Sequence, residues 1–292
     1  MNSDFSKLEN LHKFTHNAMA TVFEFFIQSD DPAYSGEAAW AAFREIDRLE
    51  DELSRFRPNS EISNINRLKP GEKLVITVDS FECIRQALEL NVITASAFDI
   101  TYSDLINTPD LPGLILDKDE MSIIRLDERT VLDLGGIGKG FAIDKASEIL
   151  NEWEIKTALI HGGFSSVKAI GKPAGSDGWP LSISDPIDSL KIILNFQLSN
   201  CSISGSGIRK GAHIIDPRTG QPALSKSGAW AFAASAAFAE GLSTAFMILD
   251  NERIKKICTE IEGIYGIILD GNYPETKKII SAGDASVIKM IV

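Results

Sequence analysis

Glu240 and Thr244 have side-chain oxygens that could bind a metal ion. They lie in residues 237–249, whose apolar spacing predicts a helix, and residues four positions apart share one face of a helix. Mg²⁺ prefers oxygen ligands and usually shares its coordination with substrate phosphate. The alternative is structural: a solvated glutamate near a helix start, and a threonine whose hydroxyl bonds back to its own helix. Spacing alone favours this structural alternative.

His213 could act as a general base. It is one of four histidines in the chain and precedes the turn-forming sequence 216–220, Asp-Pro-Arg-Thr-Gly. An unperturbed imidazole titrates at about pH 6.5, which suits proton transfer at neutral pH. The alternative is a histidine on an edge strand that supports the turn. Asp216 is expected to cap that turn through its side chain.

A glycine-rich stretch over residues 133–144, Asp-Leu-Gly-Gly-Ile-Gly-Lys-Gly-Phe-Ala-Ile-Asp, could hold a phosphate. The residues before the glycines predict a strand and those after them a helix. Glycines let the backbone approach a ligand closely, and the N–H groups at a helix N-terminus attract anions. Lys139 could add a positive charge. The alternative is a tight turn that packs the helix on the strand.

The glycine stretch matches neither of two well-known phosphate loops. A P-loop requires Gly-x-x-x-x-Gly-Lys-Ser/Thr, whereas Asp133 stands at the first glycine position and Gly140 at the hydroxyl position. The dinucleotide fingerprint requires a third glycine where this chain has Phe141. For Asp133 we favour a structural role in the turn.

The elements that must position these side chains follow an α/β pattern. Residues 15–27 alternate and predict one strand, which carries Met19 near its beginning. Residues 35–53 and 79–95 have helical spacing. Residues 123–134 predict a hairpin with its turn at 127–128, and 202–207 predict a small, flexible connection. No linker divides the chain, so we expect a single domain over residues 1–292, or two intimately packed subdomains within it.

Composition limits the classes of partner. The 292 residues carry a net charge of −12, and no basic patch is available to displace counterions from a nucleic acid or an anionic membrane. A phosphate ligand would therefore need a bridging cation. No apolar run approaches the roughly 18 residues of a transmembrane segment. The three cysteines are widely spaced and predict reduced thiols.

The N-terminal residues 1–10 have neither a basic start nor an apolar segment, and so do not resemble a secretory signal. A cytoplasmic location is expected if the sequence is complete. An exported or periplasmic location is expected if a signal segment has been removed.

Eight separate stretches together resemble one family, the ApbE-type flavin transferases, which move FMN from FAD onto a threonine or serine hydroxyl of another protein. Each stretch alone is a plausible turn or cap, but all eight occur in the order typical of the family. They are residues 19–21, 53–61 with Asn66, 97–101, 133–144, 161–163, 202–205, 213–220 and 239–244.

The resemblance implies an α/β (α+β) fold of mixed sheets and packed helices, related to the T-fold, with a FAD cleft between its parts. By position, the backbone carbonyl of Gly138 and the side chains of Glu240 and Thr244 would bind Mg²⁺. His213 would be the catalytic base. Lys139 would take part in both catalysis and FAD binding. Ser204 would lie along the pyrophosphate of FAD, and Met19 and Phe56 would lie near its rings.

The implied reaction is Mg²⁺-dependent transfer of FMN from FAD to an acceptor protein, with release of AMP. Two alternatives stay open: hydrolysis of the FAD pyrophosphate to FMN and AMP, and a catalytically silent FAD-binding relative. The chain differs from the usual family pattern at Glu240, where the family usually has Asp, and at Phe164, where it often has Asp. The segments 101–123 and 204–213 are also short.

Overall fold

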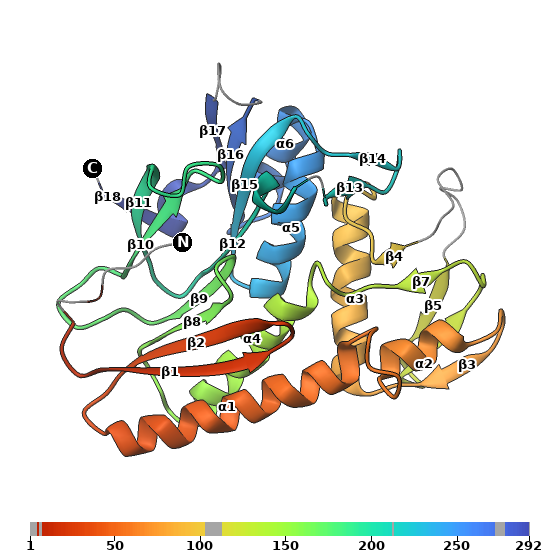
Figure 1. The fold of residues 1–292 in the computed structure, drawn as a ribbon, viewed down its shortest axis with the longest axis horizontal. Coiled ribbons are helices and arrows are strands. Elements are labelled where there is room, and N and C mark those ends of the chain that lie inside the picture. Colours follow the sequence, from red (N-terminus) through yellow and green to blue (C-terminus); the bar gives the residue numbers. More distant parts are fainter. Residues whose placement is uncertain (1–4, 6–7, 103–112, 212, 272–277, 292) are drawn as a thin grey trace.

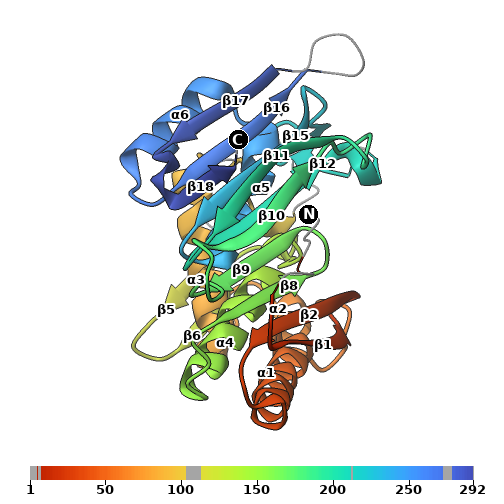
Figure 2. The ribbon, with the colours of Figure 1, turned by 90° about the vertical axis from the view of Figure 1, so that its left-hand side faces the viewer.

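A computed structural model describes residues 5, 8–102, 113–211, 213–271 and 278–291 of the chain. Its centre is an eight-stranded sheet with the order β1-β2-β8-β9-β12-β15-β16-β17, visible in Figures 1 and 2. All strand pairings within the described residues are antiparallel. The strands are β1 (Leu11–Ala18), β2 (Thr21–Gln28), β8 (Ala158–Gly162), β9 (Ser166–Ile170), β12 (Ser202–Gly207), β15 (Lys226–Ala233), β16 (Tyr265–Asp270) and β17 (Lys278–Gly283).

A second sheet packs on one face of the first. It consists of β10 (Trp179–Ser184), β11 (Ile192–Leu198) and β18 (Ile288–Ile291). Side chains of β15 show why the two faces differ, because successive residues point to opposite faces. Trp230 and Phe232 fill the layer between the two sheets. The alanines that alternate with them face the helices and leave room for close packing.

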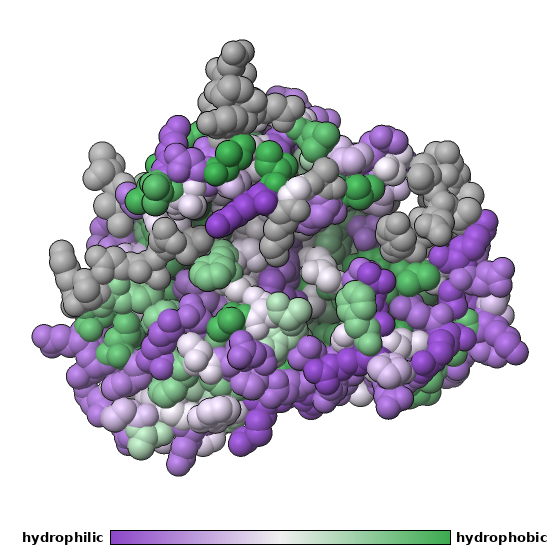
Figure 3. All heavy atoms as spheres, viewed as in Figure 1, coloured by the Kyte–Doolittle hydropathy of each residue, from purple (hydrophilic) through white to green (hydrophobic). Residues whose placement is uncertain are grey.

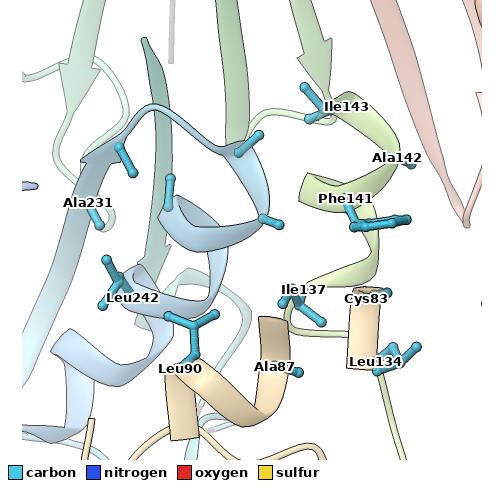
Figure 4. Close-up of a cluster of buried hydrophobic side chains, with 14 of the residues drawn as sticks. Cys83, Ala87, Leu90, Leu134, Ile137, Phe141, Ala142, Ile143, Ala231 and Leu242 are labelled. Carbon is cyan, nitrogen blue, oxygen red and sulfur yellow. The ribbon is translucent and has the colours of Figure 1, made fainter. Parts of the chain in front are cut away.

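Helices cover the other face of the large sheet. They are α1 (Pro32–Leu53), α3 (Val78–Ile93), α4 (Gly138–Glu152), α5 (Ala236–Ile248) and α6 (Asn251–Glu260). Apolar side chains of α3, α4 and α5 meet in one buried cluster, shown in Figure 4. Within the described residues, no helix has the length and apolar character needed to cross a membrane.

The chain between α1 and α4, apart from α3, forms a smaller lobe, on the right in Figure 1. It contains α2 (Glu61–Arg67), a three-stranded sheet in the order β3-β6-β5, and the pair β4-β7. These strands are β3 (Lys73–Val75), β4 (Thr101–Tyr102), β5 (Leu114–Asp117), β6 (Ser122–Arg125) and β7 (Val131–Leu132). A small hairpin of β13 (Ile215–Asp216) and β14 (Gln221–Pro222) lies beyond β12 along the chain.

The predicted combination of sheets with packed helices is confirmed. The strand pairing among the described residues is antiparallel rather than mixed, so α+β is the accurate description. The helices predicted over 35–53 and 79–95 are α1 and α3. Helix α3 begins at Val78 and is capped by Thr77, whose hydroxyl accepts from the Ser80 N–H. The strand and helix predicted around the glycine stretch are β7 and α4.

The prediction of one strand over residues 15–27 is wrong. The segment contains the two-residue turn between β1 and β2, formed by Met19 and Ala20 with φ of 50° and 54°. Such a turn usually contains Asn or Gly, because other side chains favour negative φ. The sequence therefore lacked the usual signal for this hairpin.

Two further predictions of secondary structure are corrected. Residues 123–134 do not form one hairpin, since β6 pairs with β5 and β7 pairs with β4. Residues 202–207 are not a flexible connection but strand β12, inside the large sheet. Its small residues are explained by packing: a Cβ at Gly205 would lie 2.5 Å from the indole of Trp230.

Candidate functional site

One large cleft brings together every residue that the sequence predicted for the site. Its volume is about 2760 Å³, and the residues that line it come from one end of the large sheet and from the smaller lobe. Figure 3 shows that the surface is hollowed near the middle of this face. The predicted residues that line the cleft are Met19, Phe56, Gly138, Lys139, Ser204, His213, Glu240 and Thr244.

Antiparallel pairing explains why distant segments meet here. Strand β2 begins where β8 ends, since Phe23 pairs with Gly162, and β9 begins where β8 ends, since Gly162 pairs with Ser166. Ser166 in turn pairs with Ser204 of β12. The β1–β2 turn, the β8–β9 turn and the second half of β12 therefore lie at the same end of the sheet.

The glycine stretch forms the turn that leads into α4. Asp133 fixes this turn: one carboxylate oxygen accepts from the Gly135 N–H at 2.9 Å, and the other pairs with Arg55 Nε at 3.0 Å. Asp133 thus has the structural role predicted for it. Ile137, at the N-cap position of α4, makes no side-chain capping hydrogen bond.

Glu240 carries a buried carboxylate rather than a solvated one, which rules out the solvated alternative considered from the sequence. The residue is 7% exposed. One carboxylate oxygen accepts from the Gly140 N–H at 2.6 Å, and the other accepts from Lys139 Nζ. The carboxylate on α5 is therefore bonded directly to the first turn of α4.

A row of polar groups continues from Lys139 into the sheet. Lys139 Nζ also donates to Ser166 Oγ at 2.6 Å, and Ser166 Oγ lies 2.9 Å from Ser204 Oγ. Sequence reasoning missed Ser166. The feature of the sequence that could have indicated Ser166 is its position shortly after the Gly-Gly pair at 162–163. Ser166 is the first residue of β9.

Thr244 has the back-bonded geometry of the structural alternative. Its Oγ1 donates to the carbonyl of Glu240 at 3.3 Å and lies 3.3 Å from Ser206 Oγ. Thr244 also lines the cleft, one helical turn away from Glu240. Back-bonding and exposure to a ligand are therefore compatible at this position.

His213 lies in an exposed loop at the cleft. Its Nδ1 is 3.0 Å from the carbonyl oxygen of Gly211. A carbonyl only accepts, so Nδ1 carries a hydrogen in this contact, and Nε2 is the nitrogen that has a lone pair to offer when the ring is neutral. Asp216 caps the following turn, as predicted, and the guanidinium of Arg218 holds the pKa of its carboxyl below the ordinary value.

Two phenylalanine rings are exposed in the cleft. Phe56 follows α1 and is 80% exposed, with the guanidinium carbon of Arg55 4.4 Å from its ring centre. Phe164 lies in the β8–β9 turn and is 81% exposed. Met19 also lines the cleft, from the β1–β2 turn. These side chains offer apolar surface to a planar ligand.

Helices α4 and α5 are held in close contact, which fixes Glu240 relative to Lys139. A Cβ at Gly140 would lie 2.4 Å from the Ala236 carbonyl oxygen, so only glycine fits this position. Asp144 accepts from the backbone N–H groups of Ala236 and Ala237 at 2.9 and 3.0 Å. The role of Asp144 was not predicted, because its partners lie more than 90 positions later in the sequence.

The residues present fit both an anionic ligand and Mg²⁺. An ammonium and a helix N-terminus attract phosphate, and a carboxylate, a hydroxyl and a backbone carbonyl are oxygen donors that suit Mg²⁺. Each oxygen of Glu240 has a second lone pair besides the one it already uses. The described ranges contain no group of three or more His, Cys, Asp or Glu side chains that could hold a metal. A metal in the cleft would therefore depend on this mixed set and on ligand oxygens.

The model of the ApbE family matches residues 19–268. The chain belongs to the ApbE family. The matched region includes all eight predicted site residues, from Met19 to Thr244.

Named relatives cover most of this ApbE chain. A protein of Buchnera aphidicola named FAD:protein FMN transferase is 28% identical over 250 residues, which are 73% of each chain. A protein of Vibrio cholerae with the same name is 25% identical over 249 residues, 72% of this chain and 73% of the relative.

Solved structures share the fold. The flavin transferase ApbE from Vibrio cholerae superposes with a TM-score of 0.80 at 20% identity and covers 93% of this chain and 97% of its own. The ApbE protein of Thermotoga maritima superposes with a TM-score of 0.79 at 22% identity and the same coverage. The α+β architecture described above is therefore that of ApbE proteins.

Proposed function

We propose that this chain transfers FMN from FAD to a threonine or serine hydroxyl of an acceptor protein, releasing AMP, with Mg²⁺ bound in the cleft. Family membership and relatives named FAD:protein FMN transferase support flavin transfer. The observation that carries the proposal is the single cleft shared by Lys139, Glu240 and His213. It combines a phosphate-binding cation, a metal-binding carboxylate and a base.

FAD would bind with its pyrophosphate at the N-terminus of α4. The ammonium of Lys139 and the helix dipole both favour negative charge there. Ser204 would lie beside the pyrophosphate, since its hydroxyl is joined to Lys139 through Ser166. Met19 and the exposed ring of Phe56 would contact the rings of FAD.

Gly138, Glu240 and Thr244 would hold the metal through a carbonyl, a carboxylate and a hydroxyl oxygen. Bound Mg²⁺ would offset the pyrophosphate charge and stabilise the charge that develops during transfer. The composition agrees with this requirement, because acidic residues outnumber basic ones by 41 to 29 in this chain.

The reaction needs a base and a well-placed positive charge. His213 accepts the proton of the acceptor hydroxyl at Nε2, and the hydroxyl oxygen forms a bond to the phosphorus on the FMN side. The bond from that phosphorus to the bridging oxygen breaks, and AMP leaves with this oxygen. Lys139 stabilises the negative charge on the phosphate oxygens, since phosphoryl transfer depends mainly on positioning and electrostatics.

Hydrolysis of FAD is the second candidate, and the exposure of His213 favours it. An exposed imidazole can deprotonate water as readily as an acceptor hydroxyl, which would give FMN and AMP from the same cleft. A third possibility is an FAD-binding relative without activity. Glu240 supports it, because its carboxylate already has two protein partners.

One experiment separates these outcomes. The protein is incubated with FAD, Mg²⁺ and a candidate acceptor that has an exposed threonine, and the acceptor mass and the AMP concentration are measured. A mass gain of one FMN with equimolar AMP supports transfer. AMP without a mass gain supports hydrolysis, and the absence of both products contradicts either enzymatic function.

A further inference from the structure

Lys139 occupies the position at Glu240 where a metal ion would otherwise be expected. Its Nζ donates to one carboxylate oxygen, while the Gly140 N–H donates to the other at 2.6 Å. The side chains of Lys139 and Glu240 are 18% and 9% exposed. A carboxylate with so little access to water needs a positive partner, and in this structure Lys139 is that partner.

A metal ion and the Lys139 ammonium would repel each other if both lay close to the Glu240 carboxylate. Mg²⁺ binds oxygen at about 2.1 Å, so an ion on the Glu240 oxygen that accepts from Lys139 would lie next to the ammonium. Two like charges a few ångströms apart repel strongly at a site with little solvent. Lys139 must therefore move before this oxygen can bind a metal.

A bound anion would give Lys139 a second charged partner in the cleft. Its second hydrogen bond, to Ser166, is to a neutral hydroxyl that is itself joined to Ser204. A lysine side chain has a flexible stem, and its ammonium can turn toward a phosphate oxygen. A pyrophosphate beside Ser204 would attract Lys139 and leave Glu240 in need of another cation.

We propose that Lys139 and a divalent metal ion exchange at Glu240, so that this chain binds the metal tightly only together with the pyrophosphate of a dinucleotide. The inference deepens the proposed function and rests on it, because it assumes that the pyrophosphate of FAD binds in the same cleft. The extra methylene of Glu240 relative to aspartate contributes by extending the carboxylate toward Lys139.

The test measures metal binding without turnover. Mn²⁺ takes the same oxygen ligands as Mg²⁺, and its free form gives an electron paramagnetic resonance signal that is lost on binding. The full chain is titrated with Mn²⁺, with and without FAD and in the absence of any acceptor. The variants are Lys139→Met, which removes the competing charge, and Glu240→Asp, which keeps both charges but shortens the carboxylate.

Without FAD, both variants should bind Mn²⁺ about tenfold more tightly than the unaltered chain, within the roughly 5- to 150-fold range typical of coupled sites. FAD should tighten Mn²⁺ binding to the unaltered chain by a similar factor and have less effect on Lys139→Met. Lys145→Met is the matched control: it removes another α4 lysine paired with carboxylates, those of Asp79 and Glu148, and should leave the Mn²⁺ affinity unchanged.

Equal Mn²⁺ affinities of the unaltered chain and both variants without FAD would overturn the exchange. Thermal unfolding of each variant, with and without Mn²⁺, shows whether it is folded, and Glu240→Asp still decides the question if Lys139→Met is not. The FAD-free comparison involves no FMN transfer. A chain that shows the exchange but transfers no FMN would therefore contradict the proposed function alone.

Discussion

Asp144 of α4 accepts a hydrogen bond from the backbone N–H of Ala236, the first residue of α5, at 2.9 Å. The same carboxylate pairs with Lys168 Nζ at 2.7 Å. A residue of the glycine stretch thus accepts hydrogen bonds from the N-terminus of the helix that carries Glu240, in addition to the cap by Ser235, although the two helices are far apart in the sequence. The geometry between Lys139 and Glu240 depends on this contact.

Asp144→Ala should lower the free energy of unfolding by about 3 kcal/mol, because it leaves two N–H groups of α5 without their acceptor and the partly buried Lys168 without its carboxylate. Urea denaturation measures the change. Asp144→Asn keeps an oxygen acceptor and should lower the free energy of unfolding less than Asp144→Ala does. Glu148→Ala, at an exposed position of the same helix, is the control, and its free energy of unfolding should stay within about 0.5 kcal/mol of that of the unaltered chain. An equally small effect of Asp144→Ala would refute the proposed role of Asp144.

Ala20→Gly should raise the free energy of unfolding by about 1 kcal/mol. Ala20 has a φ of 54° in the β1–β2 turn, a conformation that costs residues with a Cβ about 1–2 kcal/mol. The midpoint of urea unfolding should increase. Ala18→Gly, within β1, is the control and should lower stability, since its backbone is extended. A loss of stability in both variants would show that the turn is not strained.

Stability should decrease as the pH falls from about 6.5 to about 4 because of His161. Burial lowers the pKa of this imidazole from 6.5 to about 4, so in this window the unfolded chain binds a proton that the folded chain does not. The sign is therefore a loss of stability on acidification, of about 3 kcal/mol over the whole window. His161→Phe should remove this part of the pH dependence in urea titrations, and an unchanged profile would assign it to other groups.

Glu240→Ala should raise the Mg²⁺ concentration needed for half-maximal FMN transfer by about tenfold or more, a loss seen even for residues that support metal ligands indirectly. The Mg²⁺ dependence of AMP release measures it. Glu148→Ala again serves as the control, because its carboxylate is exposed and far along α4. An identical Mg²⁺ titration for Glu240→Ala would show that the metal binds elsewhere or is not required.

The helices and the glycine turn could be predicted from the sequence, because their signals are local. The apolar spacing around Phe43 and Ile46 defines α1, and the glycines before Phe141 define the turn into α4. The eight site residues could also be brought together, but only through the resemblance to a family. No local pattern places Met19 in the same cleft as Thr244.

The missed features depend on contacts between distant residues. The β1–β2 turn uses Met19 and Ala20 where a turn pattern would have Asn or Gly. Strand β12 looks flexible until Trp230 is seen to pack over Gly205. The pairing of Lys139 with Glu240 spans about a hundred positions, so the sequence suggested a metal ligand without revealing its competitor.

The proposed role of His213 as the base in FMN transfer is tested most directly by comparing FMN transfer by the unaltered chain and by His213→Ala. FAD binding, followed by flavin fluorescence, should be the same for both, because His213 is exposed and its side chain, among the described residues, hydrogen-bonds only to the loop carbonyl of Gly211. With FAD, Mg²⁺ and an acceptor, the unaltered chain should add one FMN to the acceptor, and the variant should be slower by a factor of about 10²–10⁴. Equal rates of acceptor flavinylation by the two proteins would contradict the account.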